Sequence, residues 1–461
     1  MSVNGNDSFV TLEGTPPAFG HDMLKMFGFE EGYVNLNHGS YGSLPLPVAE
    51  ACEKWSRKIE SNPDKFMRLD MAGQLGSVRR RLASMVGAGP DEIVIVPSAL
   101  HGVDTVLRNF EWNEGDVIIG MTTTYNGVER CIQYIHDLPP HPIISEFQLT
   151  FPNTHAAIIN TFRAHVRKLC AHQKSNAKAG QDLKIVAVID SLVSNPGVLM
   201  PWKELVQICK EEGIWSVVDA AHSIGQENDI NLGEAKPDFW VSNCHKWLFA
   251  KRGCAMLYIP KRNRHIIKSP YPTSYAYVTR PESATGEDID VANLIEQFGW
   301  TGTRDYAPYL SVNAALAFRS WIGGESAIST YCHNLALEGG KRLAEILGTS
   351  LMDTTENSEL TVNMVNVGIP LSDDVPFNSD TNVYFQKKLL QEWNCFAATY
   401  KHGGKWWTRC SAQIWNDISD FEYVGKAYLA ACKELEAMYV KEEPKAKEWT
   451  QSDELNNEAT L

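Results

Sequence analysis

The chain has 461 residues and a formal net charge of −14, from 42 Lys and Arg against 56 Asp and Glu. Hydrophobic residues make up 44% and charged residues 21%, which is typical of a globular protein with a large core and excludes disorder as the overall state. The acidic balance, with a sequence pI near 5.4, argues against a broad surface for nucleic acid or anionic membranes. We therefore expect small-molecule targets.

The ten cysteines are scattered, with no CxxC pair and no Cys/His spacing typical of zinc ligands. In a chain of this length that pattern predicts a reducing compartment, mostly inert thiols and no metal site. The first residues, MSVNGNDSFVTLEG, lack the features of a signal or transit peptide, and no apolar run reaches the ~18 residues that span a bilayer. A cytoplasmic protein without membrane segments is the expectation.

The first long apolar patterns are helical, with spacing that predicts helices over 48–69 and 71–87. Beyond them, short apolar runs that predict strands alternate with further helical patterns. The predicted strands are 92–99, 116–121, 184–192, 214–222, 238–247 and 254–260, and the helices between them are 101–110, 125–138 and 202–213. Nearly continuous apolar strands alternating with helices indicate an α/β fold with a mostly parallel sheet covered on both faces.

Two polar stretches, 170–182 and 261–293, are predicted to be loops. A long helix is predicted from residue 308, and it leads into a part of the chain where the order of strands and helices is different. There, strands are expected over 361–370 and 406–415, with separate helices flanking them. That arrangement favours an α+β lobe over a continuation of the parallel sheet.

The predicted organisation therefore has four parts. Residues 1–47 form an N-terminal arm, 48–310 a large domain and 311–440 a smaller domain. The polar and acidic residues 441–461 form a disordered tail.

Two ionisable residues stand at the ends of neighbouring strands. Asp219 ends the apolar run IWSVVD, and Lys246 follows 27 residues later in NCHKW. A lone lysine at a strand end usually points into solvent. A carboxylate at the end of a buried parallel strand, with a lysine one strand later, meets the needs of a pyridoxal 5′-phosphate (PLP) site. The amine can hold the cofactor covalently, and the carboxylate can keep the pyridine nitrogen protonated.

Five motifs occur in the order found in a known family: NLNHGSYGSLP, VDAAHS, HKW, WTGTRD and TRCSAQIWN. With them the chain, over about residues 33–435, resembles the class V aminotransferases, which include cysteine desulfurases and isopenicillin N epimerase-like proteins. The resemblance implies the fold-type I architecture of PLP-dependent transferases. That fold has a large domain with a mostly parallel sheet of the seven-stranded type between helices, and a smaller α+β C-terminal domain.

The resemblance also implies roles around the cofactor. Lys246 is matched to the lysine that binds PLP covalently, Asp219 to the partner of the pyridine nitrogen, and His222 to the residue near the phenolic oxygen. A helix N-terminus at Ser98-Ala99-Leu100 is matched to the phosphate site, where the family usually has Asn-Ala-Thr. Because Leu100 has no hydroxyl, backbone donors and His245 are expected to do more there.

Further roles concern the substrate and a second subunit. Tyr125 is expected to stack on the cofactor ring and, as the sharper hypothesis, to donate a proton during catalysis. Arg409 is matched to the arginine that holds the α-carboxylate of an amino-acid substrate, and Asn37 and His38 are expected to line the substrate side of the cleft. Thr303 is matched to the residue that reaches the phosphate of a neighbouring subunit, which predicts a homodimer with composite sites.

These residues indicate an α-amino-acid substrate more firmly than they indicate a reaction. Epimerisation, transamination and β-elimination all remain open, and a binding protein without chemistry is the alternative from another class. Desulfurase chemistry needs a mobile cysteine, and the nearby candidates Cys395 and Cys410 lie in apolar, strand-like surroundings. Cys410 should point away from the pocket because it alternates with Arg409 along a strand.

We favour a C–S lyase, because the chain is similar to the lyases of ergothioneine biosynthesis. Those enzymes cleave hercynylcysteine sulfoxide to a sulfenic acid, pyruvate and ammonia. Their substrate carries a trimethylammonium group, which aromatic and acidic side chains would suit. The candidates in this chain are Tyr271, Tyr275, Tyr277, Asp288, Asp290, Trp300, Asp305 and Tyr306.

Overall fold

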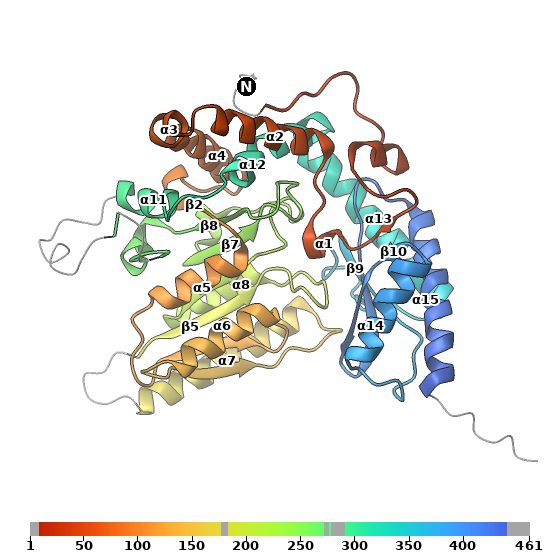
Figure 1. The fold of residues 1–461 in the computed structure, drawn as a ribbon. Coiled ribbons are helices and arrows are strands. Elements are labelled where there is room, and N and C mark those ends of the chain that lie inside the picture. The colour runs from red at the N-terminus through yellow and green to blue at the C-terminus, as the bar shows by residue number, and fades with distance from the viewer. Residues whose placement is uncertain (1–8, 177–182, 272–275, 278–290, 440–461) are drawn as a thin grey trace, which may run out of the picture.

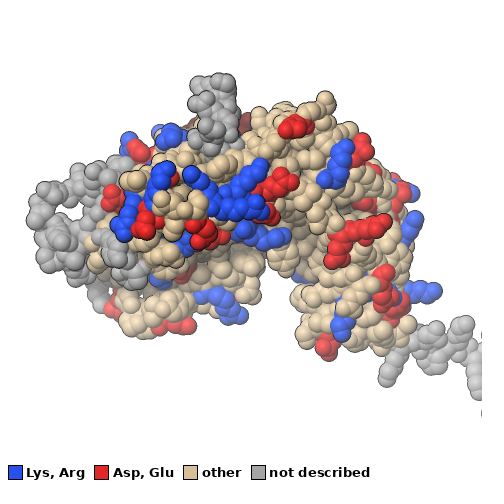
Figure 2. All heavy atoms as spheres, turned by 45° about the horizontal axis from the view of Figure 1, so that its top comes forward, with Lys and Arg blue, Asp and Glu red and all other residues tan. Residues whose placement is uncertain are grey.

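The computed structural model describes residues 9–176, 183–271, 276–277 and 291–439, so the predicted tail lies outside the described residues. Figure 1 shows a large lobe built around a central sheet and a smaller lobe that carries the C-terminal helix. Basic and acidic side chains are interspersed on the face shown in Figure 2, and the surface is notched between the lobes. Within the described ranges, no helix is long and apolar enough to cross a membrane.

The central sheet has seven strands in the order β2-β8-β7-β6-β5-β3-β4. All neighbours are parallel except the pairs made by β8, which is antiparallel to both β2 and β7. This confirms the predicted fold class, an α/β fold with a mostly parallel seven-stranded sheet. The strands are β2 (Ile93–Val96), β3 (Val117–Met121), β4 (Ile143–Phe147), β5 (Ile185–Asp190), β6 (Trp215–Asp219), β7 (Phe239–Asn243) and β8 (Ala255–Tyr258).

Helices cover both faces of this sheet because its strands are apolar on both sides. Alternate residues of one strand enter different cores: Ile93 and Ile95 join one cluster, while Val94 and Val96 join another. The first face is covered by α2 (Leu46–Ser61), α4 (Met71–Met85), α7 (His155–Asn176), α8 (Trp202–Glu212) and α12 (Ala307–Trp321). The second is covered by α5 (Ala99–Asn109), α6 (Asn126–Asp137) and α11 (Val291–Gly299).

Part of the first predicted loop is helical. Helix α7 continues to Asn176, and only 177–182 of the expected loop 170–182 lie outside the described residues. Tertiary contacts extend the helix, since Arg167 pairs with Glu212 of α8 and Gln173 donates to the carbonyl of Gly115. The second predicted loop, 261–293, begins with the 3₁₀ helix η4 (Lys261–Ile266) and ends in the first turn of α11.

The smaller lobe is built on a three-stranded antiparallel sheet in the order β11-β12-β9. A short parallel pair, β1 with β10, attaches the N-terminal segment to this lobe. The strands are β1 (Val34–Asn35), β9 (Met364–Gly368), β10 (Cys395–Phe396), β11 (Ala398–His402) and β12 (Lys405–Ser411). Its helices are α13 (Gly324–Leu347), α14 (Ser379–Lys387), η5 (Lys388–Glu392) and α15 (Ile418–Tyr439).

The expected domain boundary after residue 310 falls inside α12. This helix packs on α2 and α4 of the large lobe, whereas α13 packs on α15 and β9 of the small one. The lobes are therefore better divided at Gly323, whose φ of 119° separates the two helices. Short elements complete the chain: η1 (His21–Met26), α1 (His38–Tyr41), α3 (Pro63–Lys65), η2 (Phe66–Asp70), η3 (Pro90–Glu92) and α9 (Leu232–Ala235).

Candidate active site

A cavity of about 370 Å³ lies at the carboxyl ends of β5, β6 and β7, beside the first turns of α5 and α6. Open α/β sheets bind their ligands at this edge, because the loops that follow the strands converge there. Eight of the predicted site residues line it together: Ser98, Ala99, Leu100, Tyr125, Asp219, His222, His245 and Lys246.

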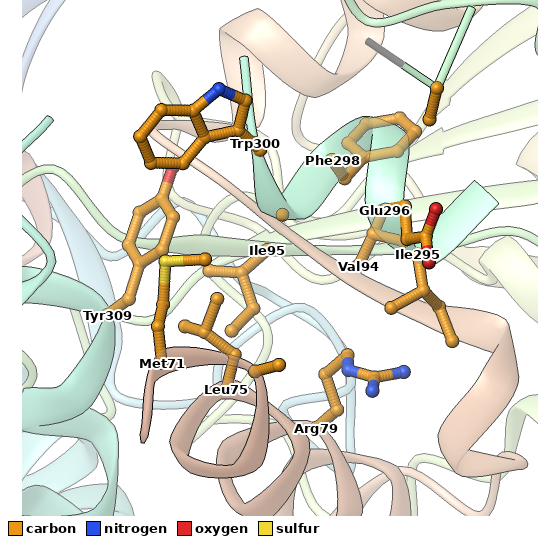
Figure 3. A pocket seen from close by; sticks show the side chains of 13 residues that line it. Met71, Leu75, Arg79, Val94, Ile95, Ile295, Glu296, Phe298, Trp300 and Tyr309 are labelled. Atoms are coloured by element: carbon orange, nitrogen blue, oxygen red, sulfur yellow. The ribbon is translucent and has the colours of Figure 1, made fainter. Parts of the chain in front are cut away.

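A larger cavity of about 500 Å³ lies between α4, β2 and α11 (Figure 3). Its lining is mostly apolar, with Arg79 and Glu296 as the charged side chains among the described residues. None of the residues predicted for catalysis reaches it. Because it offers neither a reactive amine nor a pair of carboxylates, we place the chemistry in the first cavity.

Lys246 lies in the turn after β7 and faces the first cavity, with Nζ 3.0 Å from Nε2 of His222. The indole of Trp247 can only donate, so its contact at 3.4 Å requires Nδ1 of His222 to be unprotonated. Burial holds the pKa of His222 well below its usual value, so the ring is neutral and carries its proton on Nε2. The Nε2–H group of His222 can then donate a hydrogen bond to Nζ of Lys246, which accepts it in the neutral amine form.

The electrostatics of Lys246 agree with this assignment. Burial and then the positive charge of Arg409 lower its pKa to about 7, while the charge of Asp219 opposes the change. An amine with this pKa is partly unprotonated at neutral pH, which is the form that attacks an aldehyde.

Two carboxyl groups lie at adjacent strand ends on the same side of the sheet. Asp219 is paired in register with Asp190 of β5, and both line the cavity. Burial raises the pKa of Asp219, whereas the backbone N–H of Ala221, which donates to its Oδ1 at 3.0 Å, and the charge of Lys246 favour its charged form. Burial and then the charge of Asp219 raise the pKa of Asp190, whose Oδ2 has no hydrogen-bond partner among the described residues. Asp219 is therefore the ionised member of the pair.

The expected phosphate site begins at Ser98, the N-cap of α5. Its first-turn amides already have partners, since Ala99 N donates to Asn243 Oδ1 at 2.8 Å and His101 N donates to Ser98 Oγ at 3.1 Å. A phosphate would compete with these side chains for the same amides. Leu100 lines the cavity without a polar group, as the sequence predicted.

His245 lines the same end of the cavity, and its Nδ1 donates to the carbonyl of Cys254 at 3.0 Å. Burial lowers the pKa of its ring to about 4, so the ring is neutral and Nε2 has no proton to donate. It can bind a phosphate only as an imidazolium, a form that the negative charge of the phosphate would itself favour.

These groups fit PLP. Lys246 supplies an amine with a lowered pKa, Asp219 a buried carboxylate, and α5 an 11-residue helix whose N-terminus favours anions. The unpaired oxygen of Asp190 marks an unsatisfied polar position in the same cavity.

Tyr125 is the N-cap of α6, and its side chain is 52% exposed where it lines the cavity. The ring lies beside Leu100 across the face of Gly127, where an added Cβ would come within 3.0 Å of both side chains. The Tyr125 ring can lie there only because residue 127 is a glycine. From this position the Tyr125 ring can stack on the ring of a bound cofactor.

Arg409 comes from β12 and does not itself line the cavity, but it is bonded to Ser194 and Ser40, which do. Its Nη1 donates to the carbonyl of Ser194 at 2.6 Å, and its Nη2 donates to Asn37 Oδ1 at 3.1 Å and to Ser40 Oγ at 2.7 Å. Its stem lies on Gly197, where a Cβ would approach Cδ to 2.7 Å. Burial lowers the pKa of the guanidinium to about 10, which keeps it charged at neutral pH.

Three further predicted residues, like Arg409, do not line the cavity. Asn37 is buried and holds Arg409. His38 is 1% exposed, packs against Trp247, and has Nε2 3.0 Å from the carbonyl of Lys246, so it contacts the lysine backbone and not the cleft. Thr303 lies exposed in the segment between α11 and α12, away from this cavity.

The sequence reading also missed residues that line the cavity. Asp190 ends the apolar run KIVAVID, and the rule that singled out Asp219 would have found it. Asn243 ends β7 in the same way. Ser40 and Tyr41 stand within the NLNHGSYGSLP motif, but nothing in its spacing shows which side chains face the cavity.

Comparison with known proteins agrees with this geometry. The chain matches the family described as Aminotransferase class-V over residues 151–380, and the family Aminotransferase class I and II over residues 31–249. It is 32% identical to the L-cysteine desulfhydrase-like protein lolT1 of Epichloe uncinata, over 92% of this chain and 98% of the relative. It is 30% identical to Hercynylcysteine sulfoxide lyase of Schizosaccharomyces pombe, over 90% and 98%.

Solved structures share the fold. The structure of C-DES with glycine covalently linked to its PLP cofactor matches with a TM-score of 0.69 at 19% identity, over 88% of this chain and 98% of that one. With this fold, this site and relatives at 30% identity or more over nearly their whole length, the chain belongs to the class V aminotransferase family of PLP-dependent enzymes, within its group of cysteine desulfhydrases and C–S lyases.

Proposed function

We propose that the protein cleaves the bond between the β-carbon and sulfur of an S-substituted cysteine sulfoxide, with hercynylcysteine sulfoxide as its substrate. The reaction consumes water and releases a sulfenic acid, pyruvate and ammonia, so it needs no oxidant or reductant. The relative in Schizosaccharomyces pombe supports this kind of reaction. The observation that carries the proposal is that Lys246 and Asp219 line one cavity, whose lining residues Ser194 and Ser40 are bonded to the carboxylate-binding candidate Arg409.

Each of these side chains would have a separate role in the proposed reaction. Bound PLP supplies an electron sink for the bond broken at the α-carbon. Arg409 binds the α-carboxylate, and Asp219 holds a proton at the pyridine nitrogen. The Lys246 amine removes the α-proton, and its pKa of about 7 suits a base that works at neutral pH. The Tyr125 hydroxyl protonates the departing group.

The cysteines support elimination over sulfur transfer. None of the ten, all of which lie in described segments, is exposed. Cys410 points into the core of the small lobe, as alternation with Arg409 predicted, and Cys395 lies in the same core. Burial raises the pKa of each thiol to about 12, so neither is a ready nucleophile.

Two tyrosines support a cationic side chain on the substrate. Tyr41 and Tyr125 both line the cavity and are 69% and 52% exposed, so they offer aromatic faces to a trimethylammonium group. The set predicted from the sequence is less suitable, because Tyr306 is fully buried and Trp300 lines the other cavity. Of that set, Tyr275, Asp288 and Asp290 lie outside the described residues.

We further propose a homodimer in which Thr303 completes the phosphate site of the partner. The exposed position of Thr303, away from the cavity of its own chain, supports this assignment.

A substrate panel tests the function. The holoenzyme is incubated with hercynylcysteine sulfoxide, with the analogue whose amine is not methylated, and with S-alkylcysteines and their sulfoxides. We expect pyruvate and ammonia in equal amounts, fastest with the trimethylated sulfoxide. Equal rates for the methylated and unmethylated compounds would remove the proposed cation preference. Racemisation or keto-acid exchange without pyruvate from β-elimination would refute the lyase assignment.

A further inference from the structure

Arg409 is already bonded to the protein at the nitrogen that a carboxylate needs. A guanidinium has five N–H groups: one on Nε, two on Nη1 and two on Nη2. Nη2 donates to Asn37 Oδ1 and to Ser40 Oγ, so both of its hydrogens are in use. Nη1 uses one hydrogen on the carbonyl of Ser194, and the buried Nε has no partner among the described residues.

The geometry of a bidentate pair makes this important. A carboxylate bonds in parallel either to the two Nη groups or to Nε and Nη2, because Nη1 on the other side faces Cδ. Both arrangements use Nη2. A substrate carboxylate that forms the fork must therefore displace Asn37 or Ser40.

The burial of the two residues indicates which hydrogen bond to Nη2 the substrate carboxylate would displace. Asn37 is 7% exposed and does not line the cavity, whereas Ser40 is partly exposed and does. The Ser40 hydroxyl donates its own proton to Asn37 Oδ1 at 2.8 Å while it accepts from Arg409. Rotation about one side-chain bond would release Nη2 and turn the same hydroxyl toward an arriving carboxylate.

We propose that Ser40 is a substrate-binding residue that holds Nη2 of Arg409 in the free enzyme and then donates its hydroxyl to the α-carboxylate. This inference rests on the carboxylate-binding role of Arg409 in the proposed function. The same short segment contacts the lysine, through His38 Nε2 on the Lys246 carbonyl and through Gly42 against the carbonyl of His245. The segment that holds Ser40 therefore contacts both Arg409 and the turn of Lys246.

The test uses two ligands that differ only in the carboxylate. One is an S-alkyl-α-methylcysteine, which has no α-proton to lose, and the other is the same amine without its carboxylate. Their binding to the holoenzyme is followed by the visible absorbance of the cofactor. In Ser40→Ala we expect the Kd of the amino acid to rise by about 10- to 100-fold, as for the loss of a hydrogen bond to a charged group, and that of the amine to change less than about twofold.

Ser43→Ala is the matched control, because Ser43 lies three residues further along and its hydroxyl accepts from Asn35 without touching Arg409. It should change neither Kd. Equal weakening of both ligands by Ser40→Ala would mean a structural role and overturn the inference. The variant Arg409→Lys distinguishes a failure of the Ser40 inference from a failure of the proposed function. If it weakens the amino acid selectively and Ser40→Ala does not, Ser40 is excluded while the proposed function stands. If neither variant is selective, the carboxylate site lies elsewhere and both proposals fail.

Discussion

Gly42 lies where the N-terminal segment touches the turn that holds Lys246, and its replacement by Ala should damage both stability and rate. An added Cβ would lie 1.8 Å from the carbonyl oxygen of His245 and 3.1 Å from Cα of Lys246. Real Cβ atoms essentially never approach closer than 3.0 Å, so one backbone must move by more than about 1 Å.

The energetic cost follows from what such a movement breaks. Arg252 donates to the carbonyls of Tyr41 and Gly42, and His38 bonds to the carbonyl of Lys246. Three hydrogen bonds at about 1 kcal/mol each, plus about 1–3 kcal/mol for an alanine at φ +69° and ψ 161°, a region that is essentially restricted to glycine, suggest a loss of about 4–6 kcal/mol. If Lys246 moves instead, a shift of about 1 Å should cost about 10²-fold in rate.

The measurements are urea unfolding for the free energy and pyruvate release for kcat. Gly213→Ala controls for the positive φ alone, because Gly213 has φ +71° with a ψ of 32° and its added Cβ would have no contact within 4 Å among the described residues. It should lose about 1 kcal/mol from backbone strain and keep its activity. If Gly42→Ala proves no worse than Gly213→Ala in both measurements, the proposed contact with the turn that holds Lys246 is wrong.

Other predictions concern residues that line the cavity and the second subunit. Lys246→Ala should lose the visible cofactor band and turnover together, and a borohydride-stable adduct on that variant would contradict the assignment. Because the pKa of Lys246 is about 7 and the neutral amine reacts, reconstitution of the apoenzyme with PLP should slow about tenfold per pH unit below 7 and level off above it; a flat profile from pH 5 to 8 would contradict it. Tyr125→Phe should keep the cofactor and lose about 10²–10⁴ in kcat, whereas a near-normal rate would leave the ring a stacking role alone. Mixing inactive Lys246→Ala and Thr303→Val chains should restore part of the activity if sites are shared, and proven hybrids without recovery would exclude this.

Local apolar patterning was enough to predict the large lobe. Runs such as KIVAVID are apolar on both faces, and only a sheet buried on both sides accommodates them. Since the carboxyl ends of parallel strands meet at one edge, the order of Asp219 and Lys246 along the chain already predicted that they would converge. The predicted cofactor residues 98–100, 125 and 245 line the same cavity for that reason.

The sequence could not show contacts between segments that are far apart in the chain. The bonds from Arg409 to Asn37 and Ser40 join residues about 370 positions apart, and they depend on how the small lobe sits against the large one. His38 illustrates the same limit. A polar residue beside a site motif was expected to face the cleft, yet aromatic packing and the Lys246 carbonyl place it behind the lysine.

The sequence by itself therefore determined the parallel sheet and the approach of Asp219 and Lys246 at one edge, because these follow from periodicity and strand order, while the resemblance to the family supplied the other residues predicted there. Only the tertiary structure decided which groups are paired. The proton on His222, the ionised member of the Asp190 and Asp219 pair, and the bonds already held by Arg409 all depend on distances and burial. Those quantities arise when separate elements pack together, and no local pattern encodes them.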